Sequence, residues 1–596
     1  MDPSIVTVLI ILILTVAMIV FDLVRIEVAA LLCMLALGWT GVLTPQEALS
    51  GFSSNAVIAM MGVMILGQGV AKTGIMDRFS QAILKRVGTN KSRVIGLMSL
   101  SVGMLSGLIQ NIGAAALFLP SILNISRRGK IPASTLIMPI GFAAILGGTL
   151  SMVGSGPLIL INDLLRNAGL APYGLFSVTP VGILLLLSGI GFFLLFGKFV
   201  LPDSSPQSPL VSEQEKLVAA LHLPHHIWHY GVPKNSTLID QTAEQSGVWD
   251  KFSLHVLGIS RNQNVEYAPW RETRFEAGQE LALLGKEEDV EKFASVHSLI
   301  LKGQDYPFAD LYDPDRAGFA EVIIPPRSEL VGQTIRKFSL RKRYAVEPVM
   351  LFSKGEEIRG DFSSHQILPG DTIIVHGLWE KISDLKANAD FVVATPFVVR
   401  KKDQGKVWIA SICFLGAIGL ALAGAPISMA FFTGAIAMVL VRVITIREVY
   451  QAIEWKVVFL LAGLIPLGIA MQKSGAAAFL AERVMTLVEG GHPILIVFTV
   501  AVISTLFSLF MSNVGAIVVL APLVMSMGII GGLDPRPLAL LAAVCVANSF
   551  IMPTHQVNAL LMSAGGYRNA DYIKAGSGMT LLFLLVAVTV FYLFYL

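Results

Sequence analysis

Two long blocks of apolar residues, 4–200 and 405–596, dominate the sequence and carry few charged side chains. Each block contains several runs of about 20 apolar residues, which is the helix length needed to cross the hydrocarbon core of a bilayer. Charged residues make up only 14% of the chain, whereas soluble domains contain about 25%. The chain is therefore expected to be an α-helical polytopic membrane protein.

The segment between the blocks is charged, rich in turn residues and marked by short strand-like alternation. This contrast predicts four domains: membrane repeat 1 (1–202), two small modules of an α/β insert (203–304 and 305–398) and membrane repeat 2 (399–596). The net charge of +3 is too small to indicate a nucleic-acid partner. The three cysteines lie far apart in apolar stretches, so they predict neither a disulfide framework nor a metal site.

The two apolar blocks share one sequence pattern at a nearly constant spacing. Residues 44–47, 62–74 and 110–114 match residues 445–448, 463–475 and 512–516, which gives an offset of 401–402 throughout. A colinear set of matches is hard to obtain by chance, and internal repeats of this kind are typical of secondary transporters. The membrane part is therefore interpreted as two copies of one helical unit.

The distribution of positive charge predicts that the two copies are inverted. Segment 72–93 holds six Lys and Arg residues, whereas its counterpart 473–495 holds two. Conversely, the turn at 442–447 has two Arg residues, and its counterpart at 43–47 has no basic residue. Because Lys and Arg collect on the cytoplasmic side, equivalent loops should face opposite sides. We expect external N- and C-termini, a cytoplasmic insert (201–404), five crossings per repeat and residence in the bacterial inner membrane.

Each repeat has one apolar region that is split by polar residues at membrane depth, at positions 110–111 and 512–513. In both copies a serine, Ser106 or Ser508, precedes the asparagine by five residues. A helix that ends near this serine and resumes after the asparagine would form a re-entrant hairpin. Its freed carbonyl groups would suit Na⁺, and the N-terminus of the following helix would suit an anion.

A second pair of segments, 147–157 and 547–558, combines Gly, Pro and polar residues inside apolar runs. Such residues predict unwound helices, and lipid tolerates unwound backbone only where it lines a cavity. We expect each segment to supply further carbonyl groups to the site beside its own hairpin.

The insert is also duplicated, because residues 236–239, 252–261 and 278–281 match residues 92 positions later. The run 369–377, Pro-Gly-Asp-Thr-Ile-Ile-Val-His-Gly, resembles the C-terminal subdomain of potassium-conductance regulators, the TrkA C-terminal (RCK C-terminal) type. That resemblance implies modules that dimerise and bind a small regulatory ligand. Four histidines cluster at His222, His225, His226 and His229. They permit a metal site, but a polar linker is the favoured interpretation because no Cys or carboxylate pattern accompanies them.

Taken together, the hairpin residues and the stretch from Met552 to Gly576 resemble the divalent anion:sodium symporters, most closely the sulfate-type branch. The resemblance covers both membrane halves and implies an elevator-type mechanism, a homodimer and two Na⁺ sites at the hairpin tips. Matching positions with that family implies one Na⁺ site formed by Ser106, Gln110, Asn111 and Gly154. The second implied Na⁺ site is formed by Ser508, Ser512, Asn513 and Thr554. The implied substrate site lies near Asn111, Ser155, Asn513, Thr554 and His555.

The sequence departs from that family at four positions. Ile112 and Val514 replace threonines of the hairpin motif, Gln110 replaces its first serine, and Leu158 stands where sulfate-type members usually carry Asn. These changes make dicarboxylate specificity an open question. They leave the Na⁺ sites largely intact, since much of that coordination comes from the backbone.

The sequence therefore predicts a secondary active transporter, a Na⁺-coupled symporter of a small oxyanion such as sulfate or a short dicarboxylate, regulated by its cytoplasmic modules. The alternative is an anion exchanger or an H⁺-linked efflux transporter on the same scaffold, with His555 as the candidate titrating group. A regulated ion channel is a remote alternative, because no potassium-filter loop is present. The sequence shows no metal-ligand set, nucleophile elbow or phosphate loop, so neither an enzyme nor an organic cofactor is expected.

Overall fold

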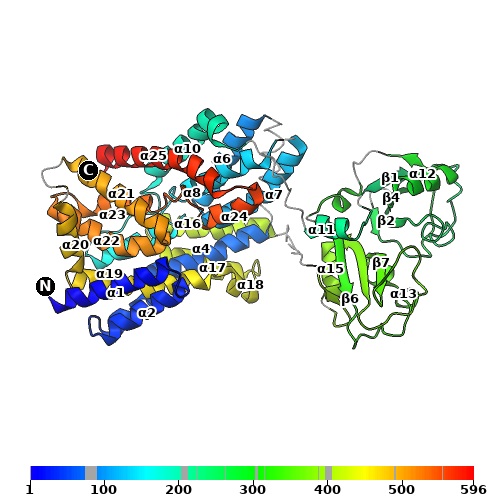
Figure 1. Ribbon diagram of the computed structural model, residues 1–596, viewed down its shortest axis with the longest axis horizontal. Helices are drawn as coiled ribbons and strands as arrows, with labels where there is room; N and C mark the ends of the chain where they lie inside the picture. The colour runs from blue at the N-terminus through cyan, green and yellow to red at the C-terminus, as the bar shows by residue number, and fades with distance from the viewer. Residues whose placement is uncertain are drawn as a thin grey trace. The chain divides into compact units, whose positions relative to one another are not determined.

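The chain folds into two compact units, Met1–Leu210 with Lys402–Leu596, and Val211–Lys401 (Figure 1). The first unit is helical, and the second contains two β-sheets. The computed structural model describes residues 2–73, 90–129, 131–202, 213–224, 226–261, 264–302, 307–314, 316–386, 388–395, 406–486, 488, 492–553 and 555–596.

The first half of the helical unit contains nine α-helices and one 3₁₀ turn among its described residues. They are α1 (Pro3–Val20), α2 (Ile26–Trp39), α3 (Pro45–Leu49), η1 (Ser50–Ser53), α4 (Asn55–Lys72), α6 (Lys91–Ser106), α7 (Asn111–Gly129), α8 (Ala133–Gly147), α9 (Gly156–Asn167) and α10 (Thr179–Val200).

The second half repeats this order. Its helices are α16 (Val407–Leu422), α17 (Ile427–Leu440), α18 (Ile446–Ala452), α19 (Trp455–Lys473), α20 (Ala476–Met485), α21 (Pro493–Phe510), α22 (Asn513–Ile530), α23 (Pro535–Cys545), α24 (Gln556–Gly565) and α25 (Asn569–Phe594). Across the described ranges, seven helical stretches are long and apolar enough to cross a membrane, and six apolar helices are shorter. The expected polytopic helical membrane protein is confirmed at this level.

The two halves contact each other reciprocally. The short helices α3 and α18 both begin with a capping box, Thr44 with Glu47 and Thr445 with Glu448. Glu47 also pairs with Lys473 of the second half at 2.9 Å. In the equivalent contact, Glu448 pairs with Lys72 of the first half at 2.7 Å. Each capping carboxylate therefore also joins its own half to the other.

Close helix packing is reciprocal in the same way. A Cβ atom on Gly62 of α4 would lie 2.9 Å from the backbone of Phe431 in α17, and one on Gly463 of α19 would lie 2.5 Å from the backbone of Ala30 in α2. The two glycines are 401 residues apart, and so are their two partners. Helix α4 thus packs on α17 while α19 packs on α2. Small residues at such contacts let the helix backbones approach closely.

The second unit contains two five-stranded antiparallel sheets. The first has the order β3-β2-β4-β1-β5, and the second β10-β6-β9-β7-β8. When the second sheet is read from its other edge, its strand order matches that of the first sheet, with every strand number raised by five. The strands are β1 (Ile227–Gly231), β2 (His255–Arg261), β3 (Asn264–Tyr267), β4 (Glu280–Leu284), β5 (Ile300–Leu301), β6 (Ala317–Ile323), β7 (Glu347–Ser353), β8 (Glu356–Ile358), β9 (Thr372–Leu378) and β10 (Val392–Val393).

Helices accompany both sheets of this unit. They are α11 (Glu213–Ala220), α12 (Glu287–Val296), η2 (Ala309–Leu311), α13 (Ile335–Phe338), α14 (Leu340–Tyr344) and α15 (Trp379–Lys386). Local irregularities recur as well, because β2 has a bulge between Val256 and Gly258, and β7 has one between Pro348 and Met350. These positions are 92 residues apart. An apolar cluster drawn from both sheets, including Leu257 and Ile374, joins the two halves of the insert.

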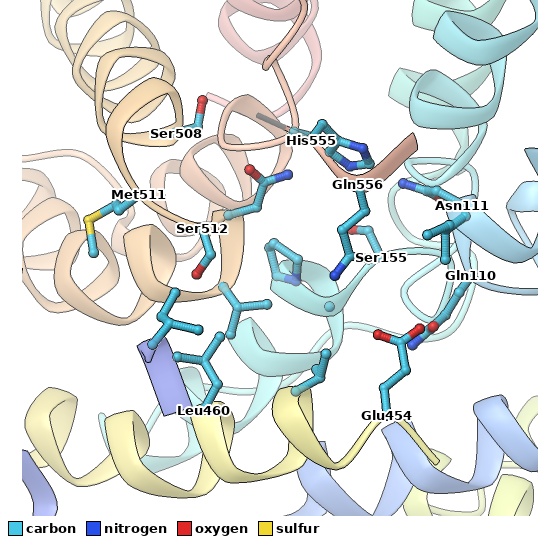
Figure 2. A pocket seen from close by; sticks show the side chains of 18 of the residues that line it. Gln110, Asn111, Ser155, Glu454, Leu460, Ser508, Met511, Ser512, His555 and Gln556 are labelled. Carbon is cyan, nitrogen blue, oxygen red and sulfur yellow. The ribbon is translucent and has the colours of Figure 1, made fainter. Parts of the chain in front are cut away.

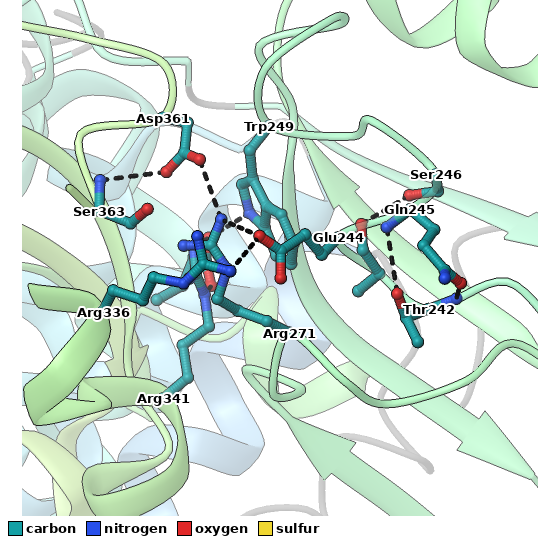
Figure 3. Close-up of polar contacts among 12 residues, drawn as sticks. Thr242, Glu244, Gln245, Ser246, Trp249, Arg271, Arg336, Arg341, Asp361 and Ser363 are labelled. Carbon is teal, nitrogen blue, oxygen red and sulfur yellow. Dashed lines mark hydrogen bonds and ion pairs between the residues drawn. The ribbon is translucent and has the colours of Figure 1, made fainter.

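Equivalent positions of the two sheet modules meet each other (Figure 3). Glu244 pairs with Arg336 at 2.7 Å, and His255 lies 3.1 Å from Glu347. The members of each pair are 92 residues apart. Residues near a two-fold axis contact their own equivalents, so the modules form a pseudo-symmetric pair within one chain. Identical copies would place like charges opposite each other, whereas these two copies carry complementary groups.

Glu347 is the most enclosed carboxylate of this interface, with no solvent exposure. It accepts hydrogen bonds from Arg341 at 2.6 and 2.8 Å and from the indole of Trp249 at 3.0 Å. The Arg341 guanidinium also lies over the Trp249 ring. Burial opposes ionisation, but Arg341 and the hydrogen bonds hold the pKa of Glu347 at about 2.

Replacing Glu347 by Ala should destabilise the insert by about 3 kcal/mol, because Arg341, whose side chain is only 12% exposed, would lose its carboxylate partner. Hydrogen exchange of the full-length protein should show lost protection in strands β2 and β7. The control is Glu357→Ala, since Glu357 pairs with Arg359 where both side chains are 41% exposed and such pairs contribute about 1 kcal/mol at most. Equal protection in the two variants would contradict this account of the interface.

Candidate functional site

The breaks between α6 and α7, α8 and α9, α21 and α22, and α23 and α24 meet at one cavity of about 420 Å³ (Figure 2). Eight of the ten predicted site residues line it: Gln110, Asn111, Gly154, Ser155, Ser508, Ser512, Asn513 and His555. Ser106 is fully buried and contacts Asn111 instead. Thr554 lies outside the described residues.

The first break gathers oxygen atoms around Asn111. Helix α6 ends at Ser106 and α7 begins at Asn111, where the sequence predicted the interruption. Ser106 Oγ lies 2.8 Å from Asn111 Oδ1 and 2.6 Å from the carbonyl oxygen of Ala144. From the unwound segment after α8, Ser151 donates a hydrogen bond to the carbonyl of Gly107. The unwound segment therefore lies against the tip of its own hairpin.

Glycines make this close approach possible. A Cβ atom on Gly147 would lie 2.1 Å from the carbonyl oxygen of Gly103, so α8 and α6 touch through their backbones. A Cβ atom on Gly148 would lie 2.3 Å from Asn111 Oδ1. Any side chain at position 148 would therefore displace the Asn111 amide, and glycine is the residue that leaves this space open.

The second break differs from the first in how its helix begins. Ser512 caps α22, because its Oγ accepts a hydrogen bond from the N–H of Gly515 at 3.1 Å. The equivalent residue of the first repeat is Gln110, whose amide nitrogen lies 3.0 Å from Met60 Sδ on α4. Gln110 is thus tied to a helix outside its hairpin, whereas Ser512 stabilises its own helix.

Asn548 holds the α23–α24 break against α21. Its amide nitrogen donates to Thr505 Oγ1 at 3.2 Å, and its Oδ1 accepts from Thr580 at 3.0 Å. Ser508 Oγ donates to the carbonyl of Thr505 at 2.8 Å and lies 3.5 Å from the carbonyl oxygen of Asn548. This network is buried and fixes the second unwound segment beside its hairpin.

Four helix N-termini converge on the cavity. Asn111, Gly156, Asn513 and Gln556 are the first residues of α7, α9, α22 and α24, and all line it. Each helix N-terminus carries about half a positive charge. The described lining contains no Lys or Arg. In addition, Ser155 Oγ is buried without a hydrogen-bond partner among the described residues. Helix ends and uncharged polar groups are therefore what this cavity offers to an anion.

His555 caps α24 and faces the same cavity. Its Nδ1 accepts a hydrogen bond from the N–H of Val557 at 3.1 Å. A nitrogen that accepts carries no proton, so the imidazole is neutral and its Nε2–H is free to donate. The sequence alone allows either a protonated or a neutral His555, and this hydrogen bond supports the neutral state.

The sequence did not single out Glu454, which lines the side of the cavity formed by α19 together with Leu460 (Figure 2). It precedes an apolar run, and no local signal distinguishes it from an ordinary helix-start residue. Asp22 is the other acidic lining residue and is exposed. Gln556 was also not assigned to the site, although it directly follows His555 in the predicted unwound segment.

The structure describes three of the four clustered histidines of the insert, His222, His226 and His229. His229 lies in β1 with its Nε2 3.0 Å from Glu280 Oε2, and His226 lies beside Trp228. His225 falls outside the described residues. Over those residues, no group of three or more His, Cys, Asp or Glu side chains is arranged to hold a metal ion.

Comparison with known proteins adds the family. The sequence profile described as citrate transporter matches residues 12–545. An uncharacterized transporter of Synechocystis sp. is 30% identical over 593 residues, which cover 96% of this chain and 95% of that protein. An uncharacterized transporter of Escherichia coli K12 is 27% identical over 594 residues, covering 95% of each chain. Sodium/sulfate cotransporter 1 of Chlamydomonas reinhardtii is 22% identical over 373 residues, covering 59% of this chain and 41% of that protein.

The profile match spans both halves of the helical unit and the insert between them. The chain therefore belongs to the citrate transporter family, whose members are membrane transporters and not enzymes.

Proposed function

We propose that this chain is a Na⁺-coupled symporter of a small oxyanion, either sulfate-like or a short dicarboxylate. The observation that carries the proposal is the convergence of four helix N-termini on one cavity that has no Lys or Arg in its described lining. Helix ends bind anions through free N–H groups and their dipoles. Asn111, Asn513, Ser155 and His555 would complete the site as hydrogen-bond donors.

Coupling to a cation follows from the charges of the cavity. The described lining has two acidic residues, Asp22 and Glu454, and no basic one. A divalent anion would then add its charge to theirs, and helix ends would offset only part of it. Bound cations supply the rest, and Na⁺ is favoured because several relatives are named sodium/sulfate cotransporters.

The oxygen atoms at the two hairpin tips would hold Na⁺. The first site would use Ser106, Gln110, Asn111 and Gly154, and the second Ser508, Ser512, Asn513 and Thr554. At the first tip, Ser106 Oγ and Asn111 Oδ1 lie 2.8 Å apart, so one hard cation could contact both. At the second, Ser508 Oγ lies near two backbone carbonyl groups.

Transport would proceed by an elevator-type movement of the two hairpins and unwound helices against the helices α1, α2, α4 and α19. The cavity lies between these two sets of elements. Reciprocal contacts between the halves and the distribution of Lys and Arg support inverted repeats with re-entrant hairpins. We further propose a homodimer in the bacterial inner membrane, with external termini and a cytoplasmic TrkA-C-like insert that binds a regulatory ligand.

Binding measurements on the purified protein should identify the substrate. Sulfate, thiosulfate, succinate and citrate would be added singly, in Na⁺ or in choline, and thermal unfolding followed. One anion should raise the unfolding midpoint in Na⁺ by several degrees and have little effect in choline, because binding to the folded state stabilises it. Stabilisation that is independent of Na⁺ but dependent on pH would instead favour the exchanger or H⁺-linked transporter.

Removal of either hairpin asparagine should weaken Na⁺ dependence while the protein remains folded. Asn111→Ala and Asn513→Ala should each raise the Na⁺ concentration for half-maximal uptake by about tenfold or more, since each removes a cation ligand and a charge-assisted contact. Asn167→Ala is the matched control, because Asn167 is exposed at the end of α9. Normal Na⁺-stimulated uptake in both hairpin variants would contradict the site assignment.

The space at Gly148 offers a test that removes no ligand. In Gly148→Ala the new methyl group would push the Asn111 amide out of place, so uptake should fall by about tenfold or more while the unfolding midpoint stays within a few degrees. Gly113→Ala is the control, because a Cβ atom there meets nothing within 4 Å. Equal uptake in the two variants would show that the position of Asn111 does not matter.

A further inference from the structure

Glu454 occupies an unusual position for a carboxylate in a cavity of this kind. It is half-buried, precedes α19 as its N-cap residue and lines the cavity that the four helix N-termini share. Figure 2 shows its carboxylate directed into the cavity on the same side as Gln110. An anion that binds at the helix ends would therefore lie in the same small volume as this negative charge.

The Glu454 side chain has no structural partner in the described chain. It forms no capping hydrogen bond to α19, whereas the backbone N–H of Glu454 lies 3.3 Å from Met64 Sδ. Lys456 lies two residues further on with an exposed side chain and does not line the cavity, although its charge favours the ionised form of Glu454. The carboxylate is thus not needed to cap the helix.

Opposing effects act on the ionisation of Glu454. Partial burial raises the pKa of its carboxyl, and the charge of Lys456 acts in the other direction. The helix dipole stabilises a negative group at a helix N-terminus, and the half-buried carboxyl stays partly hydrated, so both favour the charged form. The other charged or titratable groups in the described lining are Asp22 and His555. Asp22 is exposed, so solvent and salt screen its charge, and His555 is neutral because its Nδ1 accepts a hydrogen bond.

We propose that Glu454 is a coupling residue, a fixed negative charge that prevents an anion from occupying the cavity until a cation is bound. The inference rests on the proposed function and assigns to one side chain the dependence of anion binding on the cation. Without a cation, the anion and Glu454 repel each other across the cavity. With a cation bound, the same carboxylate adds to the attraction for that cation. Across a cavity of this size, one unit charge changes a binding constant by roughly tenfold.

Removing the charge should therefore weaken coupling without abolishing binding. The dissociation constant of the preferred anion would be measured on the purified full-length protein in Na⁺ and in choline. For the wild type, the ratio of the choline value to the Na⁺ value should be large. In Glu454→Gln that ratio should fall by roughly tenfold, mainly because binding in choline improves. Glu454→Ser tests the same change independently, since serine is a favourable N-cap residue that should keep α19 intact.

Two further variants separate the proposed role of the Glu454 charge from a structural role of the side chain. Glu454→Asp retains the negative charge and should keep most of the wild-type ratio. Asp22→Asn removes the screened charge and should change the ratio less than twofold. An unchanged ratio in both neutral variants, with normal anion binding in Na⁺, would overturn this inference alone. Absence of anion binding to the wild type under every condition would contradict the proposed function, and this inference with it.

Discussion

The structure depends on how backbone groups at broken helix ends are satisfied at membrane depth. Lipid offers no hydrogen bonds, so a free N–H or C=O group must meet protein, water or a ligand. Here four helices begin at one cavity, and their first N–H groups have no preceding turn to bond to. Ser512 and His555 satisfy part of this need. In the proposed function, the remaining N–H groups bind the anion, and no basic side chain is required.

The same constraint explains why the surrounding contacts are so tight. The breaks must be held in place by groups that do not themselves occupy the cavity. Buried glycines bring α8 against α6, and Asn548 ties the second break to α21 and α25. Reciprocal ion pairs and glycine contacts then join the two halves of the membrane unit. Because these contacts are reciprocal, the same repeated residues position the equivalent break in each half.

Much of this arrangement could be predicted from the sequence, because the same sequence pattern occurs in both halves of the membrane unit. The breaks after Ser106 and before Asn513 were predicted from matched positions 401–402 residues apart. Eight of the ten predicted site residues line one cavity. The resemblance to anion:sodium symporters agrees with the citrate transporter family found by comparison. The matching strand orders of the insert were likewise indicated by the offset of 92.

Glu454 was missed because the repeat does not encode it. Glu454 comes to the cavity from the start of a long apolar helix, and its equivalent position in the first repeat is Ser53. Local sequence cannot show that a helix start from elsewhere in the chain faces the hairpin tips. The complementary pairs of the insert, such as Glu244 with Arg336, also needed three-dimensional contacts, because sequence alone does not show which equivalent positions lie near the pseudo-two-fold axis.

The most direct test of the account is to locate the bound anion. The full-length protein would be crystallised in Na⁺ with the preferred oxyanion replaced by its selenium analogue, selenate for sulfate, and an anomalous difference map calculated. The account predicts one strong selenium peak in the cavity, placed so that the oxygens of the anion lie within hydrogen-bond distance of the N-termini of α7 and α22. A peak elsewhere in the protein, or an empty cavity under conditions where the analogue binds in solution, would contradict it.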